Sequence, residues 1–411
     1  MKNPRTAAFV GLGVLSLINL VNYLDRYILA GVMRKVQAEF TLTDTEGGSL
    51  ATTFMLVYMC ASPLGGYLGD RLPRRYLIGA AVAVWSVATI GSGLATTFVM
   101  LVVARALTGV GEAGYGTVAP SFISDLFDAR ERSRWLSVFY TAMPLGAALG
   151  FILGGVMADR ATWHHAFYAG GIPGLVLAVA ALFLSEPRRG AMDGPDTPKP
   201  VAFLDGLAQV GLNRRFWFTT AGLTLMTFSV GGLSFWMPKY LAEHRGLSDT
   251  DAGLYLGATT VIGGLVGTLA GGFLGDWLDA RRPGSGVLLS ALGLLAAAPL
   301  MVASAVVEQP TVLFACLLLA QFFIFLQGGP LNASILAAVP PTLRAFAFGL
   351  STLTLHLLGD AISPTVIGSI SDAAGLGLAI KLNALPLALG GVVLLVGLRH
   401  FRAAAPPPRA A

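Results

Sequence analysis

The chain has 411 residues, of which 55% are hydrophobic and 12% are charged, and its formal net charge is +5. Soluble domains carry about a quarter charged residues, so this composition and a mean hydropathy of +0.71 exclude a soluble globular protein. They indicate an all-α protein that crosses a membrane many times. The two cysteines, Cys60 and Cys316, lie in apolar segments and predict neither a disulfide framework nor a metal site. We expect no metal and no cofactor.

Twelve segments are apolar and long enough, at about 20 residues, to cross a bilayer as helices. They lie at 7–33, 47–69, 76–95, 98–126, 135–157, 164–184, 215–241, 251–275, 285–307, 311–339, 345–370 and 376–398. The first segment is too long for the apolar part of a secretory signal peptide and shows no small-residue cleavage site. We therefore expect it to remain as a span.

A polar stretch rich in Pro and Gly at 186–207 separates the spans into two sets of six. We predict an N-terminal six-helix bundle at 1–185, a cytoplasmic linker at 186–214, a C-terminal six-helix bundle at 215–400 and a cytoplasmic tail at 401–411. Of the 27 Lys and Arg residues, 19 lie on the side of the termini and 6 on the opposite side, while Arg26 and Arg105 lie within spans. The positive-inside rule predicts cytoplasmic termini and a multi-pass protein of the cell inner membrane. Topology thus accounts for the positive charge, and we expect no nucleic-acid partner.

Two short loops repeat at an offset of 206 residues. GGYLGDRLPRR ends the second span and GGFLGDWLDARR ends the eighth, so that Gly66 and Asp70 correspond to Gly272 and Asp276. A single copy could be only a tight turn that carries positive-inside charges. Two copies at equivalent places favour an internal repeat.

The first loop resembles the signature G-x-x-x-D-R-x-G-R-R of the major facilitator superfamily, although Pro73 stands where the family usually has Gly. The resemblance covers essentially the whole chain. It implies two six-helix bundles, alternating access and a latch between the halves at the cytoplasmic face. The predicted cytoplasmic gate residues are Gly66, Asp70, Arg71, Arg74, Arg75, Arg134, Gly272, Asp276, Arg281 and Arg282.

Three other stretches resemble the Spinster group of sphingolipid and lysolipid transporters. They are NYLDRYILAGV, RALTGVGEAGYGTVAPSFISDLF and HLLGDAISPTVIGSISD. Arg105 and Gly109 also fit the superfamily pattern R-x-x-x-G, although Thr108 replaces the usual Gln. The resemblance implies a lipid-like amphipathic substrate. A drug or organic-anion exporter, or a receptor that transports nothing, remain alternatives.

Charged residues within the spans need partners, because a charge at the bilayer centre costs at least ~2.5–3.5 kcal/mol. Asp25 lies ~12 Å below the outer end of the first span, and Arg105 lies ~11 Å below the outer end of the fourth. The matching depths predict that they can meet. Glu112 lies two turns beyond Arg105, ~10 Å away, and has no evident permanent partner. The simpler alternative is a static ion pair that fixes the two helices together.

Burial disfavours a charged carboxylate, whereas nearby arginines favour it. Glu112 could therefore take up and release a proton, and we predict proton coupling through Glu112 and, second, Asp25. His356 and Asp360 are one turn apart and could bond each other or extend the polar path. The candidate substrate-binding residues are Arg26, Arg105, Asn19, Asn22, Tyr115, Trp236, Gln327, His356 and Asp360.

The sequence shows no nucleophile–base pair or phosphate-binding loop, so we do not expect an enzyme. Helices seven and ten contain no acid and several aromatic residues, which suits the tail of an amphiphile. We expect the partners to be membrane lipids, an amphipathic small-molecule substrate and protons, and the protein to be a monomer.

Overall fold

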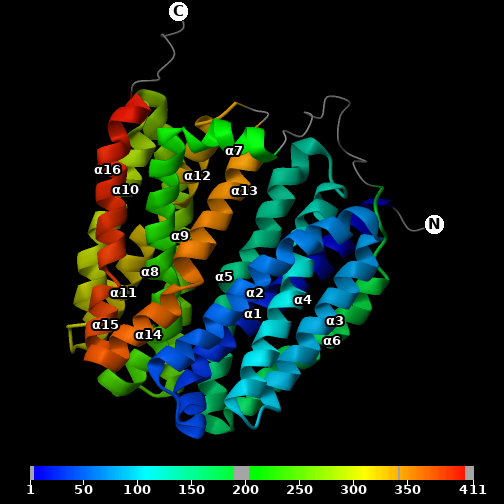
Figure 1. Ribbon diagram of the computed structural model, residues 1–411, viewed down its shortest axis with the longest axis vertical. Helices are drawn as coiled ribbons and strands as arrows, with labels where there is room; N and C mark the ends of the chain where they lie inside the picture. The colour runs from blue at the N-terminus through cyan, green and yellow to red at the C-terminus, as the bar shows by residue number, and fades with distance from the viewer. Residues whose placement is uncertain (1–3, 189–202, 341–342, 403–411) are drawn as a thin grey trace, which may run out of the picture. The chain divides into compact units, whose positions relative to one another are not determined.

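The computed structural model describes residues 4–188, 203–340 and 343–402 (Figure 1). Within these ranges, twelve helical segments are long and apolar enough to cross a membrane. The prediction of an all-α membrane protein with twelve spans is therefore confirmed. Residues 189–202 of the predicted linker and residues 403–411 of the predicted tail lie outside the described residues.

The first six spans are single helices. They are α1 (Pro4–Phe40), α2 (Asp44–Arg71), α3 (Arg74–Gly93), α4 (Phe98–Ser124), α5 (Ala129–Arg160) and α6 (Trp163–Leu182). The later elements are α7 (Phe203–Gly211), α8 (Arg214–Arg245), α9 (Asp249–Arg281), α10 (Ser285–Ser304), α11 (Pro310–Phe325), α12 (Gly328–Ala337), α13 (Arg344–Leu355), the π-helical turn η2 (His356–Asp360), α14 (Ser363–Ala374), α15 (Leu376–Leu382) and α16 (Leu385–Arg402). The short helix α7 was not predicted and lies within the expected linker.

The chain divides into two compact units. The first consists of Met1–Thr197, Ser234–Gly257 and Pro364–Asp372, and the second of Pro198–Leu233, Ala258–Ser363 and Ala373–Ala411. The first unit thus includes the end of α8, the start of α9 and most of α14. The domain boundaries proposed from the sequence, at residues 185 and 214, stay predictions.

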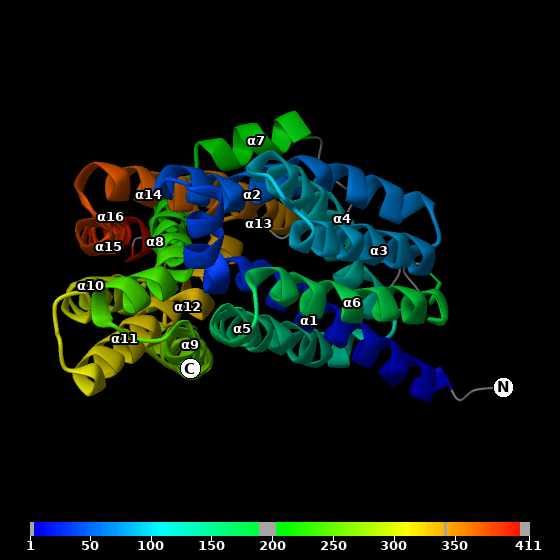
Figure 2. The same cartoon turned by 90° about the horizontal axis from the view of Figure 1, so that it is seen from below.

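Glycines on α5 let α1 and α5 pack closely in the first unit (Figure 2). A Cβ atom on Gly146 would lie 2.4 Å from the carbonyl oxygen of Leu20, and one on Gly150 would lie 2.4 Å from that of Leu24. No side chain fits at either position. The helix backbones are in contact, and this contact fixes the height of the stretch of α1 that carries Asp25.

Local capping sets where α2 and α4 begin. Thr43 and Glu46 form a reciprocal capping box at the start of α2, and the Thr97 hydroxyl accepts a hydrogen bond from the Met100 amide at the start of α4. Such caps satisfy amide groups that lack partners within the helix. The start of α4 in turn sets the depth of Arg105 in the membrane.

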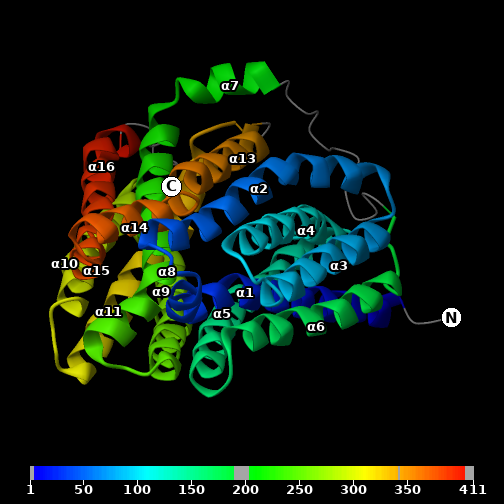
Figure 3. The ribbon, with the colours of Figure 1, turned by 60° about the horizontal axis from the view of Figure 1, so that its bottom comes forward.

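Two of the predicted spans in the later part of the chain are interrupted. The span expected at 311–339 breaks between α11 and α12 at Leu326 and Gln327, just before Gly328. The span expected at 345–370 contains η2, where the amide of Ala361 donates to the carbonyl of His356 at 3.0 Å. Proline removes a donor and disfavours the preceding helical turn, and a proline follows each interruption within four residues. Figure 3 shows α7 lying across the ends of α8 and α13.

Candidate functional site

The ion pair expected between α1 and α4 is present. Arg105 Nη1 lies 3.6 Å from Asp25 Oδ2, and both side chains are 1% exposed. Thr89 of α3 donates a hydrogen bond to the same carboxylate oxygen at 2.8 Å. The sequence analysis did not predict Thr89, because a threonine inside a span usually bonds to a carbonyl of its own helix.

Glu112 has a direct partner, which the sequence analysis missed. Arg26 Nε donates to Glu112 Oε2 at 2.8 Å, the Glu112 side chain is fully buried, and 16% of the Arg26 side chain is exposed. The expectation that Glu112 lacks a permanent partner was wrong. Successive residues on a helix point about 100° apart, so Asp25 and Arg26 reach different partners on α4.

Aromatic rings surround the Arg26 guanidinium. Its Cζ atom lies 5.0 Å from the centre of the Tyr23 ring, 5.2 Å from that of Phe54 and 4.9 Å from that of Tyr58. Arg105 Cζ lies 5.0 Å from the Phe54 ring. Such cation–π contacts favour a desolvated guanidinium. Helix α2 thus contributes Phe54 and Tyr58, which were not predicted, to the surroundings of both arginines.

Several buried polar atoms here have no hydrogen-bond partner among the described residues. They are Arg105 Nε and Nη1, Asp25 Oδ1, Glu112 Oε1 and Asn22 Nδ2. Buried polar atoms are nearly always paired in folded proteins, so this concentration marks a place where a proton, water or polar ligand can bind. Asn19 differs, because its Nδ2 donates to the Phe139 carbonyl at 3.1 Å.

Two other predicted residues are hydrogen-bonded within the packing of the first unit. The hydroxyl of Tyr115 donates to the Leu15 carbonyl at 2.6 Å, and its ring packs against Trp85. Trp236 is fully buried, and its Nε1 donates to the Pro364 carbonyl at 2.8 Å. Their roles in substrate binding stay predictions.

The remaining substrate candidates belong to the second unit. His356 Nδ1 and Asp360 Oδ1 are 2.9 Å apart across the π-helical turn, so these residues bond each other, as one of the two alternatives stated. Gln327 lies at the break before α12, and its Oε1 has no partner among the described residues. Whether these three residues extend a polar path stays a prediction.

The predicted cytoplasmic gate residues fall into a buried and an exposed class. Arg74 is 3% exposed; its Nη1 donates to Asp125 Oδ2 at 2.6 Å, and its amide donates to Glu186 Oε1 at 2.7 Å. Arg74 therefore ties the start of α3 to the end of α4 and to the start of the linker.

The exposed class consists of Asp70, Arg71, Arg134, Asp276, Arg281 and Arg282. Arg71 stacks over Tyr67 and Arg281 over Trp277, each at 3.5 Å from the ring centre, so each of these arginines lies over an aromatic ring four residues earlier in the chain. Arg75 Nη2 donates to the Tyr76 hydroxyl at 2.9 Å. A Cβ atom on Gly66 or Gly272 would meet no neighbour within 4 Å. The gating role of this set stays a prediction.

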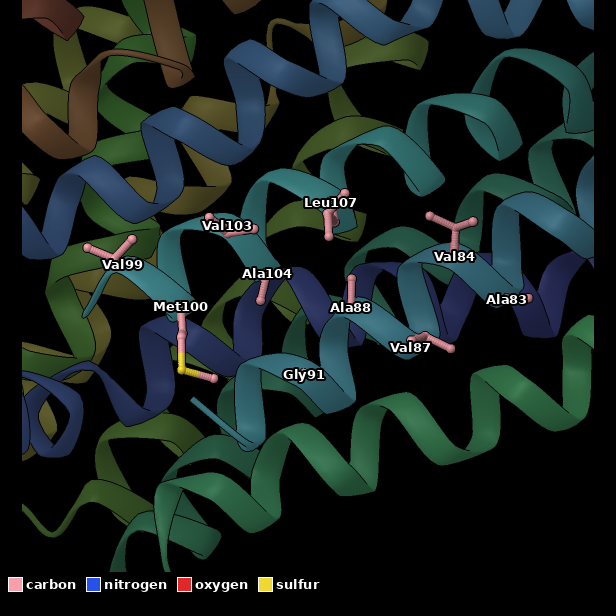
Figure 4. Close-up of a pocket in the computed structure, with 10 residues that line it drawn as sticks. All are labelled: Ala83, Val84, Val87, Ala88, Gly91, Val99, Met100, Val103, Ala104 and Leu107. Carbon is pink, nitrogen blue, oxygen red and sulfur yellow. The ribbon is translucent and has the colours of Figure 1, made fainter. Parts of the chain in front are cut away.

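An apolar groove of about 690 Å³ lies between α3 and α4 (Figure 4). It is lined by Ala83, Val84, Val87, Ala88, Gly91, Val99, Met100, Val103, Ala104 and Leu107. No charged side chain lines it, and several of its residues are exposed on the outside of the helices. It suits hydrocarbon chains and is distinct from the charged residues around Arg26.

Comparison with known proteins gives the family. The model of the Major Facilitator Superfamily matches residues 15–364. The protein spinster of Drosophila melanogaster is 34% identical over 370 residues, which cover 88% of this chain and 61% of that protein. The sphingosine-1-phosphate transporter of Danio rerio is 32% identical over 433 residues, which cover 97% of this chain and 85% of that protein. The chain belongs to the spinster family of the Major Facilitator Superfamily.

A solved structure of a bacterial homologue of the human lysosomal transporter spinster, in an inward-facing and unoccupied conformation, has the same fold. Its TM-score is 0.88 at 22% identity, with 99% of this chain and all of that chain covered. Membership of the superfamily confirms the predictions of a major facilitator fold and of a transporter rather than an enzyme. The chain spans 61% of the length of the fly spinster protein.

Proposed function

We propose that this spinster-family protein is a secondary transporter that moves a lipid-like amphiphile of the lysolipid or sphingolipid class by alternating access, driven by protons. The observation that carries the proposal is the buried charge cluster, which we define as Asp25, Arg26, Arg105 and Glu112. It holds two arginines and two carboxylates inside membrane-spanning helices, and Arg105 Nε has no hydrogen-bond partner among the described residues. Buried charges within spans typically mark substrate or ion pathways.

The two arginines suit an anionic head group. A guanidinium can hold phosphate through two parallel hydrogen bonds. Arg105 Nε makes no hydrogen bond to a described residue, and Arg105 Nη1 makes only the 3.6 Å ion pair with Asp25. The fish relative is named for sphingosine-1-phosphate, an amphiphile with a phosphate head. A lysolipid or sphingolipid with an anionic head would combine this head-group site with an apolar tail.

Glu112 can couple the head group to a proton. The carboxylate holds Arg26 at 2.8 Å, and protonation would remove its charge and weaken this pair. Arg26 would then be available to an anionic head, so the proton and the head group would bind in the same step. Asp25 is the second candidate, but Thr89 and Arg105 both favour its charged form.

The distribution of basic residues supports an orientation with both termini and the linker in the cytoplasm and the protein in the cell inner membrane. Membrane lipids would surround the twelve spans. Because one chain carries both copies of the loop repeat, we propose that a monomer transports.

Transport is tested in liposomes with an imposed pH gradient, a pH-sensitive dye inside and a fluorescent anionic lysophospholipid as the probe. We expect lysophospholipid movement to carry protons, and unlabelled lysophospholipid to compete. A hydrophilic organic anion that competed equally well would favour the second candidate, an exporter of drugs or organic anions. Binding without proton or lipid movement would contradict transport.

The head-group role of Arg105 is tested with a matched pair of variants. Arg105→Ala should weaken binding of an anionic lysophospholipid by at least 10-fold and of a neutral lipid with the same tail much less. Arg105→Lys should restore only part of the loss, because an ammonium group lacks the planar fork. Equal losses for both probes would contradict the assignment.

A further inference from the structure

The start of α8 packs against the end of α16 in the second unit, and Figure 1 shows both at the end where α7 lies. The ring of Phe218 stacks on that of His400, with 5.5 Å between the ring centres. Further along, a Cβ atom on Gly222 would lie 2.7 Å from the Leu394 side chain. Residue numbers rise along one helix as they fall along the other, so the two helices are antiparallel. The first turn of α8 therefore lies beside the last turn of α16.

Three arginines gather where these two helix ends meet. They form the basic cluster, which we define as Arg214, Arg215 and Arg399. Arg215 Nε donates a hydrogen bond to the His400 carbonyl at 2.7 Å, and Arg399 Nε lies 3.4 Å from His400 Nε2. The charges of all three guanidinium groups act on the His400 ring. The basic cluster thus concentrates positive charge at one end of the second unit.

The basic cluster lacks the counter-charge that other arginines of this protein have. Arg26 and Arg74 each face a carboxylate. No acid among the described residues forms an ion pair with an arginine of the basic cluster, and Arg214 and Arg399 are exposed. Guanidinium groups bind phosphate oxygens through their fork of N–H donors. Basic residues at the end of a membrane helix are also attracted to the head groups of anionic lipids.

Two exposed apolar side chains border the basic cluster. Leu212, in the turn between α7 and α8, is 89% exposed, more than any other large hydrophobic residue that the structure describes. Trp217 is 38% exposed, and its Nε1 donates to the Gly211 carbonyl at 2.8 Å. Tryptophan is enriched at membrane surfaces, where one part of its ring meets water and the rest meets hydrocarbon. These side chains indicate that the basic cluster lies at the level of the lipid head groups.

The turn that carries Leu212 is fixed on both sides. Asn213 Oδ1 accepts a hydrogen bond from the Phe216 amide at 3.2 Å, and Asn213 Nδ2 donates to the Ala338 carbonyl at 2.6 Å. On the other side of the turn, a Cβ atom on Gly206 of α7 would lie 3.1 Å from the ring of Phe346. Leu212 is therefore held in its exposed position by hydrogen bonds and packing, and a hydrocarbon neighbour would remove its apolar surface from water.

We propose that the basic cluster, Leu212 and Trp217 bind an anionic phospholipid of the bilayer that stays with the protein. Its phosphate would face Arg214 and Arg399, and its acyl chains would contact Leu212. A soluble anion would match the charge but would leave the apolar side chains uncovered, so the paired charge and apolar surface favour a lipid. The leaflet is the one that borders α7, which is the cytoplasmic leaflet in the proposed orientation. The site belongs to the second unit, whereas the buried charge cluster belongs to the first.

Native mass spectrometry of the purified protein in detergent tests the site without transport. Phosphatidylglycerol and phosphatidylcholine with the same acyl chains are titrated separately, and bound lipids are counted. We expect the first phosphatidylglycerol to bind about 10-fold or more tighter than the first phosphatidylcholine. The double variant Arg214→Gln, Arg399→Gln should remove this difference and leave phosphatidylcholine binding unchanged. Arg215 is kept, because its bond to the His400 carbonyl joins the two helices.

A second double variant controls for the loss of net charge. Arg160→Gln, Lys381→Gln removes two positive charges from loops that the sequence places on the opposite side, and it should change phosphatidylglycerol affinity by less than about 2-fold. Equal losses in the two double variants would overturn the site, because the effect would then follow from net charge alone. Unchanged phosphatidylglycerol affinity in the first double variant, or an equal loss for both lipids, would also overturn it.

Leu212→Ser and inorganic phosphate separate a lipid from a free anion. We expect Leu212→Ser to weaken phosphatidylglycerol binding by about 3-fold or more, because the acyl chains lose an apolar contact. Inorganic phosphate at millimolar concentration should not displace the lipid. Displacement by phosphate, together with full affinity of Leu212→Ser for phosphatidylglycerol, would mean a site for soluble anions and would overturn the proposal.

The Arg105→Ala variant separates this site from the proposed transport site. It should bind phosphatidylglycerol with nearly wild-type affinity while losing affinity for the anionic lysophospholipid. Arg214→Gln, Arg399→Gln should show the reverse pattern. If Arg105→Ala alone removed phosphatidylglycerol binding, the lipid would occupy the buried charge cluster, and the proposal of a surface site would be overturned. Absence of lysophospholipid transport with intact phosphatidylglycerol selectivity would instead count against the proposed function.

Discussion

The buried charge cluster and the contact of Arg34 with Asp249 both join α1 to another helix through an arginine and an aspartate, yet they are built differently. In the contact of α1 with α9, both carboxylate oxygens of Asp249 are bonded by Arg34, whose side chain is 36% exposed. In the buried charge cluster, Arg105 is 1% exposed and leaves two donor atoms without a hydrogen-bond partner among the described residues. A contact near water whose polar atoms are all hydrogen-bonded can form and separate. Buried polar atoms without hydrogen-bond partners instead suit a place where a proton or a ligand binds and leaves.

Asp25→Asn should have the largest effect on stability. It leaves Arg105 buried without its counter-charge, which costs about 3–5 kcal/mol for a buried pair. The measurement is thermal unfolding of the purified protein in detergent, with the exposed acid variant Asp251→Asn as the control. A loss no larger than that of the control would mean that the buried charge cluster is solvated and does not differ from the contact of Arg34 with Asp249.

Arg74→Ala and Arg71→Ala test whether burial, rather than membership of a signature loop, decides the cost. Arg74 is buried against Asp125, so its loss should destabilise the fold by about 3 kcal/mol. Arg71 is exposed over Tyr67, and its loss should cost less than about 1 kcal/mol. Comparable unfolding temperatures for the two variants would contradict this division of the gate residues.

Thr89→Val should have a smaller effect that is specific to the buried charge cluster. It keeps the shape of the side chain and removes one hydrogen bond to the Asp25 carboxylate, which is worth about 1.5–3 kcal/mol for a charged partner. Because Asp25 then relies on Arg105 alone, head-group binding should weaken as well. Thr117→Val is the control, since that hydroxyl bonds to a carbonyl of its own helix. Equal losses in the two variants would rule out a positioning role for Thr89.

The sequence was sufficient for the features that depend on length, depth and charge count. Twelve spans follow from apolar runs, and equal depths in the membrane predicted the contact of Asp25 with Arg105 correctly. The pairing of Arg26 with Glu112 was missed because it depends on the direction and reach of a long side chain, which backbone depth does not contain. The interruptions at Gln327 and His356 were missed although a proline follows each within four residues, because the apolar runs on both sides of each interruption together have the length of one span.

The contacts at the N-terminal turns of α2 and α9 show a signal that was present in the sequence but weak. Arg34 and Lys239, Asp44 and Asp249, and Gly48 and Gly253 share one separation, yet each pair alone resembles ordinary residues at the end of a span. Only the hydrogen bonds of Asp159 and Asp372 reveal that the repeated positions act on each other. Thr89, by contrast, has no counterpart in the repeat that could have identified it.

Proton-driven transport by Glu112→Gln protein in liposomes tests the central claim most directly, because glutamine keeps the shape of the side chain but cannot be protonated or deprotonated. We predict that an imposed pH gradient no longer drives accumulation of the anionic lysophospholipid, with at least a 10-fold loss of rate. Binding of the lipid should survive and lose its dependence on pH, since Arg26 is then free of its carboxylate at every pH. Accumulation at the wild-type rate under the same gradient would contradict the account and would move the proton site to Asp25 or Asp360.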